Sequence, residues 1–266
     1  MSTSKALMDG AIVAKRNLIK IKRVPDLLVF STISPIMFIL LFAYIFGSAI
    51  ATPGVNYKEF LMPGIFAQTM IFGATITGSG MADDIKKGII DRFRSLPMSR
   101  SAVLIGRTGS DLANNVLIIV VMSVTGLLVG WRIRTSVGEA VVGFVLLLVF
   151  AYAISWIMAW VGLLVPSPEV VNNASFIVIF PLTFIANTFV PTDHFPTPLK
   201  FVANWNPVSS VTLAARQLFG NTPAHQQVGD YWSLQHPVPY TLLWVVLLLL
   251  IFIPLSILQY KKAASR

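Results

Sequence analysis

The stretch Pro239–Gln259, PYTLLWVVLLLLIFIPLSILQ, runs for 21 residues without a charged side chain. As an α-helix, at about 1.5 Å per residue, it would be roughly 30 Å long, which matches the hydrocarbon thickness of a lipid bilayer. Its apolar residues are continuous, whereas the strands of a membrane β-barrel alternate apolar and polar positions over about ten residues. The stretch therefore predicts a membrane-spanning helix.

Five further apolar segments have similar lengths, and they lie at about 27–47, 60–81, 112–130, 137–165 and 170–190. Hydrophobic residues make up 55% of the chain and charged residues only 12%, against about a quarter charged in an ordinary water-soluble protein. This leaves too little polar surface to cover a soluble globule of 266 residues. We therefore predict an all-α integral membrane protein with six transmembrane helices in a single domain, residues 1–266, the last span lying at about 239–259.

The positive charges indicate how these spans are oriented. With six spans, both termini share one side of the membrane with the second and fourth connections, and that side carries 15 of the 20 Lys and Arg residues. The positive-inside rule therefore places both termini in the cytoplasm. The net charge of +9 fits a membrane surface as partner, and we expect no nucleic-acid partner because the cations lie beside apolar runs.

Residues 5–23 precede the first span and combine basic residues with apolar residues at helical spacing. Leu7, Ala11, Ala14, Leu18 and Ile21 share one helical face, and most of the basic residues lie off it. This pattern predicts an N-terminal amphipathic helix in the cytoplasmic headgroup layer. A plain cluster of charge that only fixes the topology is the alternative.

The connection between the fifth and sixth spans, at 191–237, is too long for a simple turn. Within it, Asn206 is a candidate N-cap, Pro207 suits the first helical position and Gly220 suits a C-terminal stop. We therefore predict a short external helix that packs against the membrane or the bundle.

The sequence lacks the motifs of most catalytic sites. No phosphate-binding G-x-x-x-x-G-K-[ST] loop occurs, cysteine is absent, and the three histidines are widely spaced. The adjacent Asp83 and Asp84 could hold the magnesium of a diphosphate, as in a membrane prenyltransferase, but no second acidic cluster accompanies them. We predict that the chain is not an enzyme and holds neither a metal nor a cofactor.

Polar side chains inside the predicted spans are costly if they face lipid, so they should face other helices or a polar cavity. The candidates for a substrate path are Gln68, Thr69, Thr75, Asn172, Asn173 and Asn187. Hydrogen bonds between helices would explain the same residues without any ligand. Arg107 and Asp111, four residues apart, can pair at the cytoplasmic edge of the third span.

The connection at 83–107 mixes charged and apolar side chains. The sequence around it, MADDIKKGIIDRFRSLPMSRSAVLIGRTGSDL at 81–112, resembles the first cytoplasmic loop of the type-2 ABC exporter permeases, in particular the daunorubicin-resistance-like transmembrane subunits. Asn206, Pro207 and Arg216 resemble the external segment of the same family. Asp91 departs from the family pattern, in which Glu is common. The matching loop positions are Asp84, Gly88, Asp91, Arg92, Phe93, Leu96, Pro97, Ser99, Arg100, Gly106 and Arg107.

This resemblance covers essentially the whole chain and implies a single transmembrane permease domain that works as a dimer. Each half would rest on a separate ABC ATP-binding subunit, two copies per transporter, through a cytoplasmic coupling helix at 83–107. ATP and Mg²⁺ would be bound by that partner. A docking helix needs apolar side chains for buried area and charges for orientation. The residues expected to couple to the ATPase are Asp84, Gly88, Ile89, Ile90, Asp91, Arg92, Phe93, Arg94, Leu96, Pro97 and Arg100.

From these observations we expect the transmembrane subunit of an ATP-driven exporter in a bacterial plasma membrane. Its cargo would be hydrophobic or amphipathic, a drug, an antibiotic or a lipid, because the spans carry weakly polar rather than charged residues. The second permease of the dimer could be an identical or a similar chain. A non-transporting scaffold or signalling subunit, and a lipid-modifying enzyme, are the alternatives.

Overall fold

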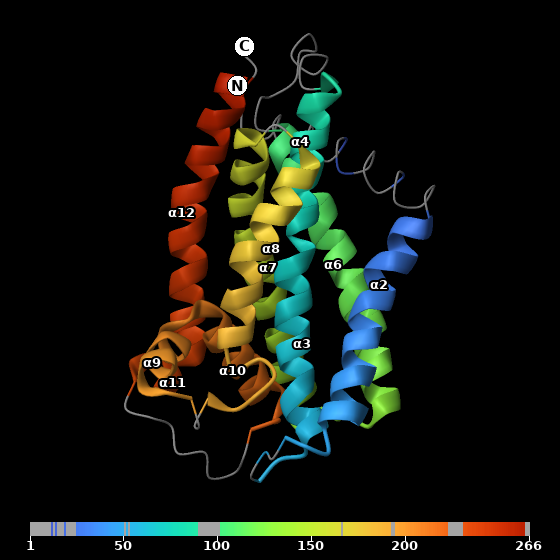
Figure 1. Ribbon diagram of the computed structural model, residues 1–266, viewed down its shortest axis with the longest axis vertical. Helices are drawn as coiled ribbons and strands as arrows, with labels where there is room; N and C mark the ends of the chain where they lie inside the picture. Colours follow the sequence, from blue (N-terminus) through green and yellow to red (C-terminus); the bar gives the residue numbers. More distant parts are fainter. Residues whose placement is uncertain are drawn as a thin grey trace.

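The computed structural model describes residues 12, 14, 19, 25–50, 52, 54–89, 102–165, 167–192, 195–222 and 231–263. Every regular element in these ranges is a helix. The long helices run side by side as a bundle, and three shorter ones gather at the end opposite to the C-terminal end of α12 (Figure 1). The predicted all-α class is therefore confirmed for the described residues.

Five helical stretches are long and apolar enough to cross a membrane. Helices α3 (Tyr57–Gly73) and α4 (Thr75–Lys86) continue into one another and form the first of these stretches. The other four, each at a predicted span, are α6 (Ala102–Val129), α7 (Val137–Leu164), α8 (Pro168–Ile185) and α12 (Pro237–Ala263).

The first predicted span, at 27–47, corresponds to α2 (Pro25–Leu40) and the π-helix η1 (Leu41–Phe46). Its described apolar helix, Thr32–Phe46, is shorter than the roughly 20 residues that a span requires. The sixth span therefore stays a prediction. The amphipathic N-terminal helix also stays one, because only Ile12, Ala14 and Ile19 are described there, all three as helical.

Helix α7 lies at the centre of the bundle and packs against α12, α4, α6 and α3. Glycines allow the closest of these contacts: a Cβ on Gly162 of α7 would lie 2.2 Å from the carbonyl oxygen of Gly78 in α4. In a bilayer the lipid tails are as apolar as the helix surfaces, so close packing rather than water exclusion holds helices together. The contact between Gly78 and Gly162 is therefore central to the bundle.

The segment between α8 and α12 contains α9 (Thr197–Trp205), α10 (Pro207–Phe219) and α11 (Trp232–Gln235). Helix α10 has the ends that its sequence predicts, because the Asn206 side chain accepts a hydrogen bond from the Val208 amide and Gly220 ends the helix with φ = +69°. Almost all of α10 is buried, and it packs against α7, α12 and α3. It is thus part of the bundle interior, and its external location stays a prediction.

Replacing Gly162 with Ala should lower the free energy of unfolding by about 1–3 kcal/mol, because the added methyl group overlaps the Gly78 backbone. Gly109→Ala is the matched control, since a Cβ at Gly109 meets nothing within 4 Å. Alanine should even favour the helix there by about 1 kcal/mol. Thermal unfolding in detergent micelles measures both variants, and equal stability of the two would contradict the close α4–α7 contact.

Candidate functional site

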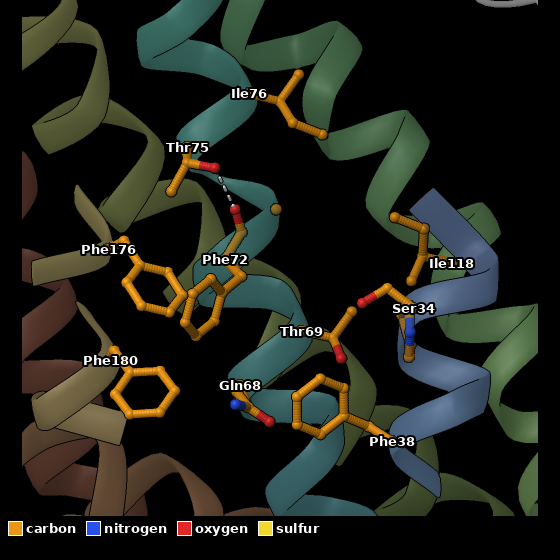
Figure 2. Close-up of a pocket in the computed structure, with 12 residues that line it drawn as sticks. Ser34, Phe38, Gln68, Thr69, Phe72, Thr75, Ile76, Ile118, Phe176 and Phe180 are labelled. Carbon is orange, nitrogen blue, oxygen red and sulfur yellow. Dashed lines mark hydrogen bonds between the residues drawn. The ribbon is translucent and has the colours of Figure 1, made fainter. Parts of the chain in front are cut away.

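A cavity of about 450 Å³ lies between α2, α3, α4, α6 and α8 (Figure 2). Pockets that hold drug-sized ligands have volumes of roughly 300–1,000 Å³, so this cavity can accommodate one. None of the side chains that line it in the described part of the chain is charged. They are Ser34, Pro35 and Phe38 from α2, Gln68, Thr69, Phe72 and Gly73 from α3, Thr75 and Ile76 from α4, Ile118 from α6, and Phe176 and Phe180 from α8.

Aromatic rings from three helices form much of the cavity wall. The ring of Phe72 meets that of Phe176 edge to face, with 6.2 Å between the centroids, and Phe176 stacks on Phe180 at 4.9 Å. Phe38 of α2 faces them across the cavity (Figure 2). An aromatic wall of this kind offers both apolar area and ring faces to a ligand.

Gln68 is the most unusual polar residue of the cavity. It is 5% exposed, and Figure 2 places its carboxamide between the rings of Phe180 and Phe38. Within the described part of the chain the carboxamide forms no hydrogen bond. Because Gln68 lines the cavity, its carboxamide is available to a ligand that can both donate and accept a hydrogen bond.

The other polar groups near the cavity are already engaged to different degrees. The Thr75 hydroxyl donates a hydrogen bond to the Phe72 carbonyl oxygen at 2.7 Å. One turn further along α4, the Ser79 Oγ lies 2.6 Å from the Asn172 Oδ1, so Asn172 lies next to the cavity. Thr69 lines the cavity beside Gln68. Four of the six predicted path residues are therefore brought to one region.

Asn173 and Asn187 lie elsewhere. Asn173 is exposed on α8 and is not part of the cavity lining. Asn187 lies in the turn after α8, where its carbonyl oxygen accepts a hydrogen bond from the Arg216 Nη2 at 2.6 Å. This turn exists because α8 ends at Ile185, whereas the predicted span continues to residue 190.

Arg216 of α10 is 2% exposed and binds main-chain oxygens. Its Nε donates to the Phe60 carbonyl oxygen at 2.8 Å, and its Nη2 donates to the Thr188 carbonyl oxygen at 3.1 Å as well as to Asn187. The guanidinium also lies 3.6 Å from the centroid of the Phe60 ring. Arg216 thereby connects α10, α3 and the turn after α8.

At the other end of the cavity, the predicted pair of Arg107 and Asp111 is confirmed, with 3.6 Å between the Arg107 Nε and the Asp111 Oδ2. The Thr77 hydroxyl also donates to the Asp111 carboxylate. Arg107 further donates from Nη2 to the carbonyl oxygen of Ile76, a residue of the cavity lining, at 2.9 Å. These contacts hold α6 against α4.

The predicted coupling segment, 83–107, is described at both ends, at 83–89 and at 102–107, where α6 begins. Asp84 is buried near the end of α4, and Gly88 turns the chain with φ = +63°. Asp83 binds Lys87 at 2.7 Å, and this hydrogen bond raises the pKa of Lys87 above its usual value. Of the expected coupling residues, Asp84, Gly88 and Ile89 are described, whereas the others lie at 90–101, outside the described ranges: Ile90, Asp91, Arg92, Phe93, Arg94, Leu96, Pro97 and Arg100.

The prediction missed the aromatic residues of the cavity. A signal for them is present in the sequence, because phenylalanines recur every fourth residue in α8, at Phe176, Phe180 and Phe184. Residues four apart share one face of a helix. Among the described residues, no three His, Asp or Glu side chains come close enough to bind a metal ion.

Comparison with known proteins shows clear relatives. The sequence profile of the ABC-2 type transporter family matches residues 10–219. The daunorubicin resistance ABC transporter permease protein DrrB1 of Streptomyces coeruleorubidus is 33% identical over 214 residues, 80% of this chain and 76% of that protein. A putative transport permease, ycf38, of Cyanophora paradoxa is 23% identical over 79% of this chain and 74% of its own. The putative transport permease ycf38 of Porphyra purpurea is 22% identical over 79% of this chain and 73% of its own length.

The substitution Gln68→Leu should leave the free energy of unfolding within about 1 kcal/mol of that of the native protein, because the lost carboxamide forms no hydrogen bond within the described part of the chain. Asn206→Leu is the matched amide control. Its Nδ2 donates to the Leu182 carbonyl oxygen at 2.7 Å and its Oδ1 accepts from the Val208 amide at 2.8 Å, so its loss should cost about 2 kcal/mol. Denaturation in detergent compares the two, and an equal loss in both would mean that Gln68 has a structural role.

Proposed function

Because the chain belongs to the ABC-2 type transporter family, we propose that it is the transmembrane subunit of an ATP-driven exporter for a hydrophobic or amphipathic molecule. The chain is a multi-pass membrane protein and a transporter subunit rather than an enzyme. The observation that carries the proposal is the uncharged cavity with an unpaired carboxamide, that of Gln68, in its wall.

The chemistry of the cavity favours a particular class of cargo. The cavity is lined by phenylalanine rings, hydroxyl groups and one uncharged carboxamide. Such a lining suits a molecule with an apolar or aromatic body and a few polar groups, such as a drug, an antibiotic or a lipid. A highly charged cargo would find no counter-ion among the lining residues. Daunorubicin, named in the description of one relative, is a fluorescent aromatic compound of this class and serves as a probe.

Energy for transport comes, in this proposal, from a separate ATP-binding subunit that carries ATP and Mg²⁺. Two copies of it would dock on the coupling segments at 83–107 of two permease chains, identical or similar. The end of α4 that leads into this segment lies at the same end of the bundle as the C-terminal end of α12 (Figure 1). This arrangement supports a cytoplasmic location of both in a bacterial plasma membrane.

The coupling segment can be tested in inside-out vesicles that contain this chain and its ATPase partner. Phe93→Ala should lower ATP-dependent daunorubicin accumulation about ten-fold, because it removes a predicted apolar docking residue. Lys87→Ala, an exposed position in the same connection, is the control and should retain transport. Membrane insertion of both variants is checked by their yield in the membrane fraction.

Two results would contradict the proposal. If accumulation persists with a partner that cannot hydrolyse ATP, the chain is not part of an ATP-driven exporter. If Phe93→Ala and Lys87→Ala transport equally well, the segment does not couple the two subunits, and the charges there only fix the topology.

A further inference from the structure

Two rows of phenylalanines lie on the helices that border the cavity. In each row the residues are four positions apart, so their rings share one helical face. A seventh ring, that of Phe189 in the turn after α8, joins the rows. The rows are Phe38, Phe42 and Phe46 on α2 and η1, and Phe176, Phe180 and Phe184 on α8.

The rings make a continuous stack. Along α8 the centroid of Phe180 lies 4.9 Å from that of Phe176 and 4.1 Å from that of Phe184. Phe184 meets Phe189 at 4.9 Å, with the two ring planes tilted by 42°. Phe189 then stacks on Phe42 of η1, with centroids 4.4 Å apart and ring planes 18° from parallel.

This stack leads out of the cavity. Phe176 and Phe180 line the cavity, whereas Phe184, Phe189 and Phe42 do not. Helices α8 and η1 both extend from the cavity toward the end of the bundle that holds α9, α10 and α11 (Figure 1). The rings therefore lie between the cavity and the predicted external side.

The two sides of the stack are held differently. Phe189 is buried, its carbonyl oxygen accepts a hydrogen bond from the Tyr57 hydroxyl at 3.1 Å, and the two preceding carbonyl groups are bound by Arg216. Phe42 lies opposite on a π-helix, and Phe46 at its end is 42% exposed. Single π-helical turns occur often at functional sites. Phe189 is thus held by more hydrogen bonds of its own turn, whereas η1 lies on the more exposed side of the stack.

From this arrangement we infer that the phenylalanine stack is a second ligand-binding region, through which a planar aromatic molecule leaves the cavity. The inference rests on the export function proposed above. As the molecule passes, it replaces each ring–ring contact with a ring–ligand contact of the same kind, so little stacking energy is lost. A flexible aliphatic molecule separates the rings without replacing their contacts, and it is moved less efficiently.

The test compares two cationic probes in vesicles that contain the permease and its ATPase partner: daunorubicin, which has a planar aromatic body, and dodecyltrimethylammonium, which has none. Phe184→Leu and Phe189→Leu keep the apolar character but remove the ring. They should lower ATP-dependent daunorubicin transport about five-fold relative to dodecyltrimethylammonium transport. Phe252→Leu, which removes a ring that packs on Trp160 outside the stack, should leave the ratio unchanged.

The aliphatic probe reports whether each variant folds and couples to the ATPase. An equal fall in transport of both probes would overturn the inference, because the rings would then serve only packing. Unchanged daunorubicin transport in both variants would also overturn the inference. The same holds if the native protein transports the aliphatic probe but not daunorubicin. The absence of any ATP-dependent transport by the native complex would reject the proposed function itself.

Discussion

The buried guanidinium of Arg216 holds one end of the helix bundle together, and the rest of the structure depends on this interaction. Its hydrogen bonds reach the main-chain oxygens of Phe60 in α3 and of Asn187 and Thr188 after α8. Taking a charge out of water is expensive unless its donors are satisfied, and here three main-chain oxygens satisfy them. The same bonds set the position of α8, which forms one wall of the cavity.

The close approach of α3 to the turn after α8 completes this arrangement. A Cβ on Gly64 would lie 2.1 Å from the Thr188 carbonyl oxygen, so only glycine permits the contact. Tight backbone packing therefore holds α3 against the turn after α8 at this end of the cavity, while at the other end Ser79 contacts Asn172 and Arg107 binds the Ile76 carbonyl oxygen.

Much of the fold could be predicted because lipid imposes a simple rule on the sequence: continuous apolar runs become helices. The ends of α10 were equally readable from Asn206, Pro207 and Gly220. The burial of α10 could not be predicted in the same way. The Ser210 hydroxyl, for example, donates a hydrogen bond to the Pro237 carbonyl oxygen at 2.9 Å. Such a hydroxyl looks the same in a sequence whether it faces solvent or another helix.

The candidate site was predicted in part for similar reasons. Gln68, Thr69 and Thr75 stand out as polar residues inside a span, and all three line the cavity. Asn187 stood out equally, but α8 ends before it and its main chain binds Arg216 instead. The phenylalanines of the wall gave no such contrast, because a phenylalanine that faces lipid has the same neighbours in the sequence as one that faces a ligand.

The central claim is that this cavity holds the transported molecule, and the absence of cysteine from the chain allows it to be tested directly. The single cysteine of a Thr69→Cys variant, in the permease–ATPase complex in vesicles, can be labelled with a membrane-permeant maleimide. Daunorubicin should slow this labelling at least five-fold, and Gln68→Leu introduced alongside should weaken the protection. Labelling at the same rate with and without saturating daunorubicin would contradict the claim.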